Sequence, residues 1–267
     1  MRRGTARLDA RDRTVRVSVR HAAIAAFWLG LVAMTGPAPA AEIALLSSTA
    51  MREPLEALVP AFEHSSGHMV AMRFESSGVL PDTVRGGARA DLVVTTPPLI
   101  EALAKDGKLN AVRMALFVRS RIGVAVRAGA PKPDISTPDA FKAALLAARS
   151  VGISKGPSGV HMMGVLQRLG IAEPVRAKAV ITEFGQRVGV QIANGNAEIG
   201  MQQITELLAT PGIDVIGPLP AALQADIVYA IAPMAGAPAS PAADALVAYL
   251  TSPAIVPVIA RMGLEPG

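Results

Sequence analysis

Three loops rich in small hydroxyl side chains are the clearest candidates for chemistry. They read SST at 47–49, ESSG at 75–78 and KGPSG at 155–159, and each follows a short apolar run typical of a β-strand. In open α/β sheets, ligands bind outside the carboxyl ends of the strands, next to the N-termini of the following helices. Hydroxyl groups and free backbone N–H groups donate hydrogen bonds there. Three such loops therefore predict one shared site for an oxyanion or a carboxylate.

The third loop, taken alone, allows two interpretations. It opens the segment GPSGVHMMGVLQRLG at 156–170, in which Met162, Val165, Leu166 and Leu169 form one apolar stripe of a helix. Ser158 at the start of that helix is a preferred N-cap residue, and a cap can be its whole purpose. Alternatively, the flanking glycines leave room for an anion on the positive end of the helix.

Residues suited to catalysis or metal binding are few. Beyond residue 40 the histidines are His64, His68 and His161, and the last falls in a first helical turn, where imidazolium is disfavoured. The sequence contains no H-E-x-x-H motif and no P-loop motif. Arg121 and Arg187 are candidates for clamping an acid group. We expect no metal and no cofactor.

The composition excludes several classes of protein. The 267 residues are 51% hydrophobic, enough for a packed core in one domain or two small lobes. The sequence has no cysteine, which rules out a disulfide scaffold, a zinc–cysteine site and a cysteine nucleophile. Aromatic residues are only 3%, too few to favour a base-stacking surface for nucleic acid.

Residues 1–40 have the pattern of a secretory signal peptide. Arginines are frequent up to residue 20, an apolar run follows at 22–34, and small residues precede an expected cleavage site near Ala40. Removing this leader leaves 19 basic and 19 acidic residues, so the pI of 10.0 belongs largely to the leader. The sequence therefore predicts export to the periplasm and no nucleic-acid partner.

Short apolar strands alternate with amphipathic helices in the rest of the chain, which predicts an α/β fold with parallel sheets covered by helices. A proline-rich segment at 128–139 is expected to be a loop. The predicted strands lie at 43–47, 69–74, 91–96, 121–126, 151–154, 198–204, 214–218 and 227–232.

The order and spacing of several segments resemble a periplasmic solute-binding protein of the molybdate-binding type. The segments are SST, FESSGVL, ARADLVVTT, GPSGVHMMGVLQRLG, AEIGMQQITELL and GIDVIGPLP, and the resemblance covers residues 42–265. It implies two α/β lobes, each a mostly parallel sheet flanked by helices, joined by two crossover strands. The implied lobes are 41–119 plus 226–267 and 120–225, with the ligand between them.

The resemblance also implies a set of ligand-binding positions. Gln203 stands where molybdate binders usually have a tyrosine, and gap-free counting places Ala50 at the ligand-contacting serine of the first loop. The paired amides Gln202 and Gln203, together with Arg187, favour a small organic acid at least as much as molybdate. The implied positions are Ser48, Thr49, Ser77, Ser158, Gly185, Arg187 and Gln203.

The function implied is that of a binding protein rather than an enzyme, which captures a molybdate-like oxyanion or a small organic carboxylate for the membrane permease of an ABC-type importer. We expect a monomer, since the sequence has no long apolar heptad pattern. Presentation of the ligand to a membrane receptor would use the same site. A branch of the family resembles aconitate isomerase, so an isomerase of an unsaturated tricarboxylate is the alternative. Glu75 and His161 are then the candidates for moving a proton.

Overall fold

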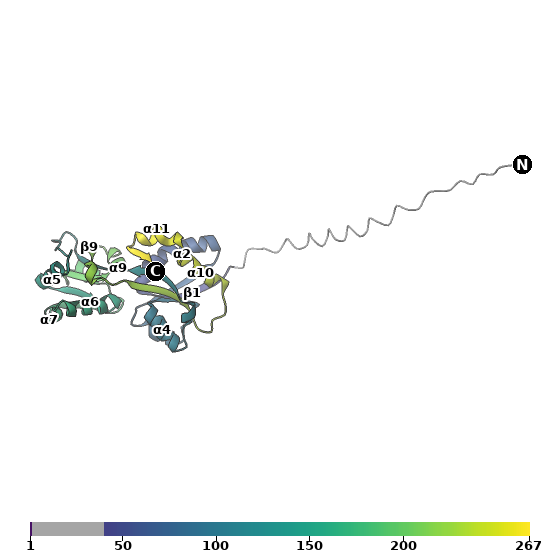
Figure 1. The fold of residues 1–267 in the computed structure, drawn as a ribbon, viewed down its shortest axis with the longest axis horizontal. Helices are drawn as coiled ribbons and strands as arrows, with labels where there is room; N and C mark the ends of the chain where they lie inside the picture. Colours follow the sequence, from purple (N-terminus) through teal and green to yellow (C-terminus); the bar gives the residue numbers. More distant parts are fainter. Residues whose placement is uncertain (2–39) are drawn as a thin grey trace. The chain divides into compact units, whose positions relative to one another are not determined.

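The computed structural model describes Met1 and residues 40–267. The predicted signal peptide lies almost wholly at 2–39, outside the described residues, and its cleavage near Ala40 stays a prediction. The chain divides into two units, Met1–Ala40 and Ala41–Gly267. Every helix and strand that the structure describes belongs to the second unit (Figure 1).

A six-stranded sheet forms the first lobe, in the order β11-β4-β10-β3-β1-β2. β1, β2, β3 and β4 run in one direction, whereas β10 is antiparallel to β3 and β4, and β11 is antiparallel to β4. The strands are β1 (Glu42–Ser48), β2 (Met69–Glu75), β3 (Leu92–Thr95), β4 (Ala115–Ser120), β10 (Ile227–Pro233) and β11 (Leu264–Pro266).

Helices cover both faces of this sheet, which is why its central strands are apolar on both sides. Alternate residues of one strand enter different cores: Leu45 of β1 packs with α2, α10 and α11, and Leu46 packs with α3 and α4. Figure 1 shows α2 and α10 on one side of β1 and α4 on the other. The helices are α2 (Arg52–Ser66), α3 (Leu80–Arg85), α4 (Pro97–Lys105), α10 (Pro241–Leu250) and α11 (Val256–Ala260).

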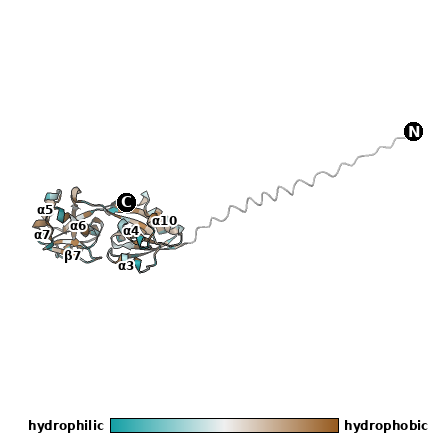
Figure 2. Cartoon of the chain, turned by 60° about the horizontal axis from the view of Figure 1, so that its bottom comes forward, coloured by the Kyte–Doolittle hydropathy of each residue, from teal (hydrophilic) through white to brown (hydrophobic). Residues whose placement is uncertain are grey.

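A five-stranded sheet forms the second lobe, in the order β7-β6-β8-β5-β9. β6 is parallel to β7 and β8, and β5 is antiparallel to both β8 and β9. The strands are β5 (Ile122–Arg127), β6 (Val151–Ser154), β7 (Ala179–Thr182), β8 (Ile199–Gln203) and β9 (Ile213–Pro218). Figure 2 colours the elements of both lobes by hydropathy.

The helices of the second lobe also divide between two faces. Those at 138–176 pack into one core with Val124 and Met201, while those at 188–208 close a smaller core around Ala125. The helices are α5 (Pro138–Ala147), α6 (Pro157–Arg168), α7 (Ala172–Arg176), α8 (Val188–Ala193) and α9 (Ile204–Leu208).

The chain crosses between the two sheets twice. It leaves the first sheet at β4 and enters the second at β5, with only Arg121 between them, and it returns between β9 and β10. The Gln224 side chain joins the two crossings: its Oε1 accepts from Ile122 N and its Nε2 donates to Ile122 O, both at 3.0 Å. The lobe boundaries themselves remain the ones predicted from the sequence.

The predicted two-sheet α/β architecture is confirmed, and both sheets are mixed, with parallel and antiparallel pairs. β10 is antiparallel to β3 and β4, and β5 is antiparallel to β8 and β9. The sequence analysis did not find β4, β7 and β11 or the short helices α7, α8 and α9. Segments of three to six residues are too short for a clear periodicity.

No single helix among the described residues is long and apolar enough to span a membrane. Pro241–Leu250 and Pro253–Ala260 meet the length and composition only as a pair, with a bend of 53° between them. Leu246 and Leu250 of the first helix are fully buried in the core.

The turn from β6 into α6 is closely packed. The Oγ atoms of Ser154 and Ser158 lie 3.0 Å apart and are buried. A Cβ atom on Gly159 would lie 1.5 Å from the carbonyl oxygen of Ser154, so only glycine allows this approach. At the other end Gly170 has φ +70°, as its position after the helix predicts.

Gly159→Ala should destabilise the protein by about 3 kcal/mol, the upper end of the range for overpacking, because the Ser154 carbonyl cannot yield without moving the strand. Gly164→Ala on the same helix is the matched control. Its Cβ would meet only Arg168 Nη1 at 3.8 Å, and it should stabilise by about 0.5–1 kcal/mol through helix propensity. Urea denaturation measures both. Equal effects of the two substitutions would contradict the packing described for this turn.

Candidate functional site

A small polar cavity lies between the two sheets. Its volume is about 30 Å³, room for about two water molecules at ~10–15 Å³ each. Residues from both lobes line it: Thr49, Ala50, Ser76, Ser77, Ser154, Gly156, Pro157, Ser158, Glu183, Phe184, Gly185, Gln186, Gln202, Gln203 and Glu206. The cavity therefore joins all three serine loops identified in the sequence.

Five of the seven predicted site residues line this cavity, namely Thr49, Ser77, Ser158, Gly185 and Gln203. Parallel strands position them: Thr49, Ser77 and Ser158 follow the ends of β1, β2 and β6, Gly185 follows β7, and Gln203 is the last residue of β8. Ser48 is fully buried beside the cavity, and its Oγ lies 3.4 Å from Ser77 Oγ. Ala50, the ambiguous position of the first loop, also lines the cavity.

Arg187 does not line the cavity but forms an ion pair with Glu53. Its Nη2 donates to Glu53 Oε1, and its Nη1 donates to the Ala209 carbonyl at 3.3 Å. The pair links the first turn of α2 in the first lobe to the loop before α8 in the second. The guanidinium, predicted to clamp an acidic ligand, is thus engaged by a carboxylate of the protein.

The paired glutamines hold the cavity wall together. Gln202 Oε1 accepts from Val188 N at 2.7 Å, which fixes the start of α8. Gln203 Nε2 donates to the Tyr229 hydroxyl at 2.9 Å and lies 3.4 Å from Glu206 Oε2. Gln203 Oε1 is buried without a hydrogen-bond partner. A tyrosine hydroxyl is therefore present beside Gln203, contributed by β10.

Burial dominates the electrostatics of this region. The pKa of the Glu206 carboxyl is raised from 4.5 to about 7, mainly by burial and in smaller part by the Glu53 charge, while Arg187 and a hydrogen bond with Gln202 act in the opposite direction. Burial also raises the pKa of Tyr229 far above its ordinary value, so this hydroxyl stays protonated. Glu206 can therefore gain or lose a proton near neutral pH on the cavity wall.

Other sequence-derived candidates lie away from the lining of the cavity. Glu75 Oε1 accepts from Arg73 Nη2 at 2.6 Å. His161 Nε2 lies 2.8 Å from the Leu223 carbonyl, and Arg121 Nη2 is 2.8 Å from Glu265 Oε1. Each has a partner within the protein, and none of the three belongs to the lining.

The sequence analysis missed Glu206, Glu53 and Phe184. Glu206 lies three residues after Gln203 in the segment AEIGMQQITELL, so it shares a helical turn with a predicted site residue. This spacing from Gln203 was the one feature of the sequence that could have identified Glu206 as a site residue. Burial of the carboxyl and the pairing of Glu53 with Arg187, 134 residues away, depend on the tertiary structure.

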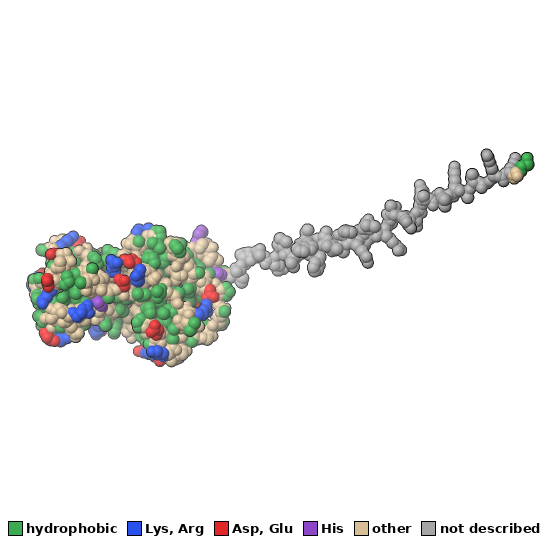
Figure 3. All heavy atoms as spheres, viewed as in Figure 1, with side chains coloured by type: hydrophobic (Ala, Val, Ile, Leu, Met, Phe, Trp, Pro, Cys, Tyr) green, Lys and Arg blue, Asp and Glu red, His purple; other side chains and the backbone are tan. Residues whose placement is uncertain are grey.

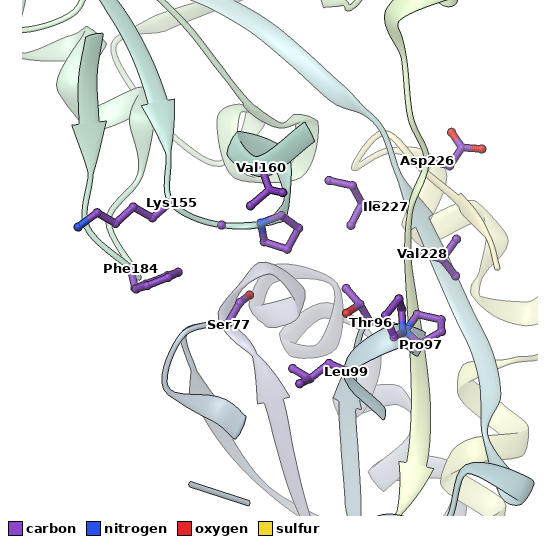
Figure 4. A pocket seen from close by; sticks show the side chains of 13 residues that line it. Ser77, Thr96, Pro97, Leu99, Lys155, Val160, Phe184, Asp226, Ile227 and Val228 are labelled. Atoms are coloured by element: carbon purple, nitrogen blue, oxygen red, sulfur yellow. The ribbon is translucent and has the colours of Figure 1, made fainter. Parts of the chain in front are cut away.

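A wider cleft of about 600 Å³ adjoins the polar cavity (Figure 4). Ser77, Gly156, Pro157 and Phe184 line both. Its other walls are mainly apolar, contributed by the start of α4, by α6 and by β10.

Charges of both signs are interspersed over the visible face of Ala41–Gly267 (Figure 3). Among Met1 and residues 40–267, no group of three or more His, Asp or Glu side chains is arranged to hold a metal ion. The candidate site of the described chain is therefore the polar cavity with its adjoining cleft.

The pKa of Glu206 predicts how stability depends on pH. Because the folded state holds this proton more tightly than the unfolded state, the stabilisation is present below pH 4.5 and is lost as pH rises to about 7. Glu206→Gln should remove this dependence. Between pH 5 and 8, the free energy of unfolding of the wild type should fall by up to about 3 kcal/mol relative to that of the variant. Urea titrations at several pH values measure it, with exposed Glu101→Gln as control. A constant difference across pH would contradict the burial of Glu206.

Comparison with known proteins shows the family of the chain. The family described as bacterial extracellular solute-binding protein matches residues 43–265. Aconitate isomerase from a Pseudomonas species is 32% identical over 250 residues, which covers 91% of this chain and 95% of that protein. The molybdate-binding protein of Azotobacter vinelandii is 26% identical over 254 residues, covering 90% of this chain and 95% of that protein.

The solved structure of the periplasmic molybdate-binding protein of Azotobacter vinelandii has the same fold. It superposes with a TM-score of 0.69 at 20% identity, covering 84% of this chain and 99% of that chain. The predicted resemblance to binding proteins of the molybdate type is confirmed. With the family match extending from β1 to β11, the chain belongs to the bacterial extracellular solute-binding proteins.

Proposed function

We propose that this protein captures a small organic anion in the polar cavity between its sheets and delivers it to the permease of an ABC-type importer. One observation carries the proposal: hydroxyl groups and loop backbone from the ends of β1, β2 and β6 converge on one cavity. Each hydrogen bond to a charged ligand contributes ~1.5–3 kcal/mol. Several together support micromolar affinity after the costs of ordering the complex.

The donors and acceptors of the cavity favour an organic acid over a tetrahedral metal oxyanion. A fully deprotonated oxyanion accepts hydrogen bonds at every oxygen. Gln203 Oε1 is a buried acceptor without a partner, and Glu206 becomes a carboxylate above pH 7. A ligand that carries a hydroxyl or carboxylic O–H beside its carboxylate would satisfy such an acceptor, which is otherwise costly to bury.

Delivery requires that the lobes open and close. The two crossings, β4–β5 and β9–β10, are short connections that can act as a hinge. The Glu53–Arg187 pair would form only in the closed state, because its partners belong to different lobes. Cleavage near Ala40 would release residues 41–267 as a monomer into the periplasm, where the permease is reached.

Glu206 favours isomerisation as a second candidate function. A carboxyl with a pKa of about 7 on the cavity wall is suited to accept and return a proton near neutral pH. As carboxylate it would take a proton from a carbon next to a double bond and return it at the other end of the allylic system. The double bond then moves without net gain or loss of atoms. The 32% identity to an aconitate isomerase points the same way.

Binding is tested with residues 41–267 against citrate, cis- and trans-aconitate, malate, sulfate, molybdate and tungstate, by thermal shift and then calorimetry. The double variant Ser77→Ala, Ser158→Ala should weaken the tightest-binding anion roughly 100-fold or more, because two donors are lost. Ser65→Ala, an exposed serine of α2, is the control. Unchanged affinity in a folded double variant would place the site elsewhere.

Isomerase activity is tested by incubating the purified protein with cis- or trans-aconitate and separating the two acids by chromatography. If Glu206 moves the proton, Glu206→Gln should lower kcat by about 10²–10⁴-fold, the usual contribution of a general acid–base group. Glu75→Gln, outside the lining of the cavity, should retain the rate. Tight binding of aconitate without interconversion of its two isomers would contradict the isomerase activity and would be consistent with the transport function.

A further inference from the structure

We propose that the cleft beside the polar cavity holds the hydrocarbon body of the ligand, so that the preferred ligand is a carboxylic acid with one anionic head and an apolar chain or ring. This inference rests on the proposed function, since it places the carboxylate in the polar cavity. It names a substrate class that the serine loops alone do not specify.

The first step is a comparison of the volumes of the polar cavity and the cleft. The polar cavity, at about 30 Å³, has room for about two water-sized groups, which is the size of a carboxylate head. The remaining atoms of an organic acid must lie outside it. The adjoining space of about 600 Å³ is within the range for small-molecule pockets.

The second step is the connection between the two spaces. Ser77, Gly156, Pro157 and Phe184 line both, so the polar cavity and the cleft adjoin at these residues. The Phe184 ring crosses from the second lobe to lie against the first: a Cβ atom on Gly78 would be 2.6 Å from its ring carbons. Phe184 thus presents an apolar face where head and body of a ligand would meet.

The third step is the chemistry of the walls. The cleft gathers large apolar side chains that remain accessible to solvent, with Val160 71% exposed and Phe184 47% exposed. Contiguous exposed apolar surface of this kind marks a binding site more often than isolated residues do. The apolar lining beyond the residues shared with the polar cavity consists of Pro97, Pro98, Leu99, Val160, Ile227 and Val228.

The fourth step is the state of the charged residues at the cleft. Lys155 Nζ lies 2.7 Å from both carboxylate oxygens of Glu183. Asp226 lies within 4.0 Å of Arg119 and Arg121. In Figure 4 the ammonium of Lys155 and the carboxylate of Asp226 both point away from the centre of the pocket. A second or third carboxylate in the cleft would therefore meet apolar walls and no uncommitted cation among the lining residues.

Calorimetry with butanoate, hexanoate and octanoate tests the inference on residues 41–267. Affinity should rise roughly tenfold for each two methylenes added, because each buried methylene contributes a constant increment. Val160→Asp should remove this gain and bring octanoate to the affinity of butanoate. Val112→Asp, which replaces an exposed valine outside the cleft, is the matched control and should leave the series unchanged.

Equal affinity along the series, or tighter binding of citrate or aconitate than of octanoate, would overturn the apolar cleft while leaving anion capture in place. An unaltered chain-length gain in folded Val160→Asp would also overturn it. If none of these acids and none of the inorganic oxyanions binds, the proposed function fails together with the inference.

Discussion

The Glu53–Arg187 ion pair is the interaction on which the proposed closure of the lobes and the protonation of Glu206 both depend. It joins α2 to the loop before α8, and both of its charges act on Glu206 in the wall of the polar cavity. Both side chains are largely withdrawn from water, with 21% and 29% of their surfaces exposed. Removing one partner of such a pair leaves an uncompensated charge. Each of the two charges is therefore neutralised by a residue of the other lobe.

The charges of Arg187 and Glu53 also influence the protonation of Glu206. Arg187 favours the charged form of Glu206, but burial and the nearby Glu53 favour the neutral form more strongly. At neutral pH Glu206 is therefore protonated in about half of the molecules, and it places less negative charge on the cavity wall than an ordinary carboxylate would. An anion can enter such a cavity without strong repulsion, and its own charge would favour the protonated form of Glu206 further. The charge of the ligand, the protonation of Glu206 and the proposed closure of the lobes are thus linked through Glu206, Arg187 and Glu53.

The sequence predicted the serine loops well because parallel strands place their carboxyl ends at one edge of a sheet. The residues there, Ser77 and Ser158 among them, line the cavity for that reason. The pairing of Arg187 with Glu53 was beyond prediction, because the two residues are 134 positions apart and meet only through the tertiary structure. The contact of Gln203 with the Tyr229 hydroxyl, 26 residues further along the chain on β10, could not be predicted for the same reason. Burial, which sets the pKa of Glu206, left no local pattern in the sequence.

A crystal structure of residues 41–267 with the tightest-binding anion of the screen would test the central claim most directly. The account predicts the anionic group between Ser77 and Ser158, with its oxygens within hydrogen-bonding distance of both hydroxyl groups and the Glu53–Arg187 pair formed. An anion bound elsewhere on the protein, with this cavity containing only water, would contradict it.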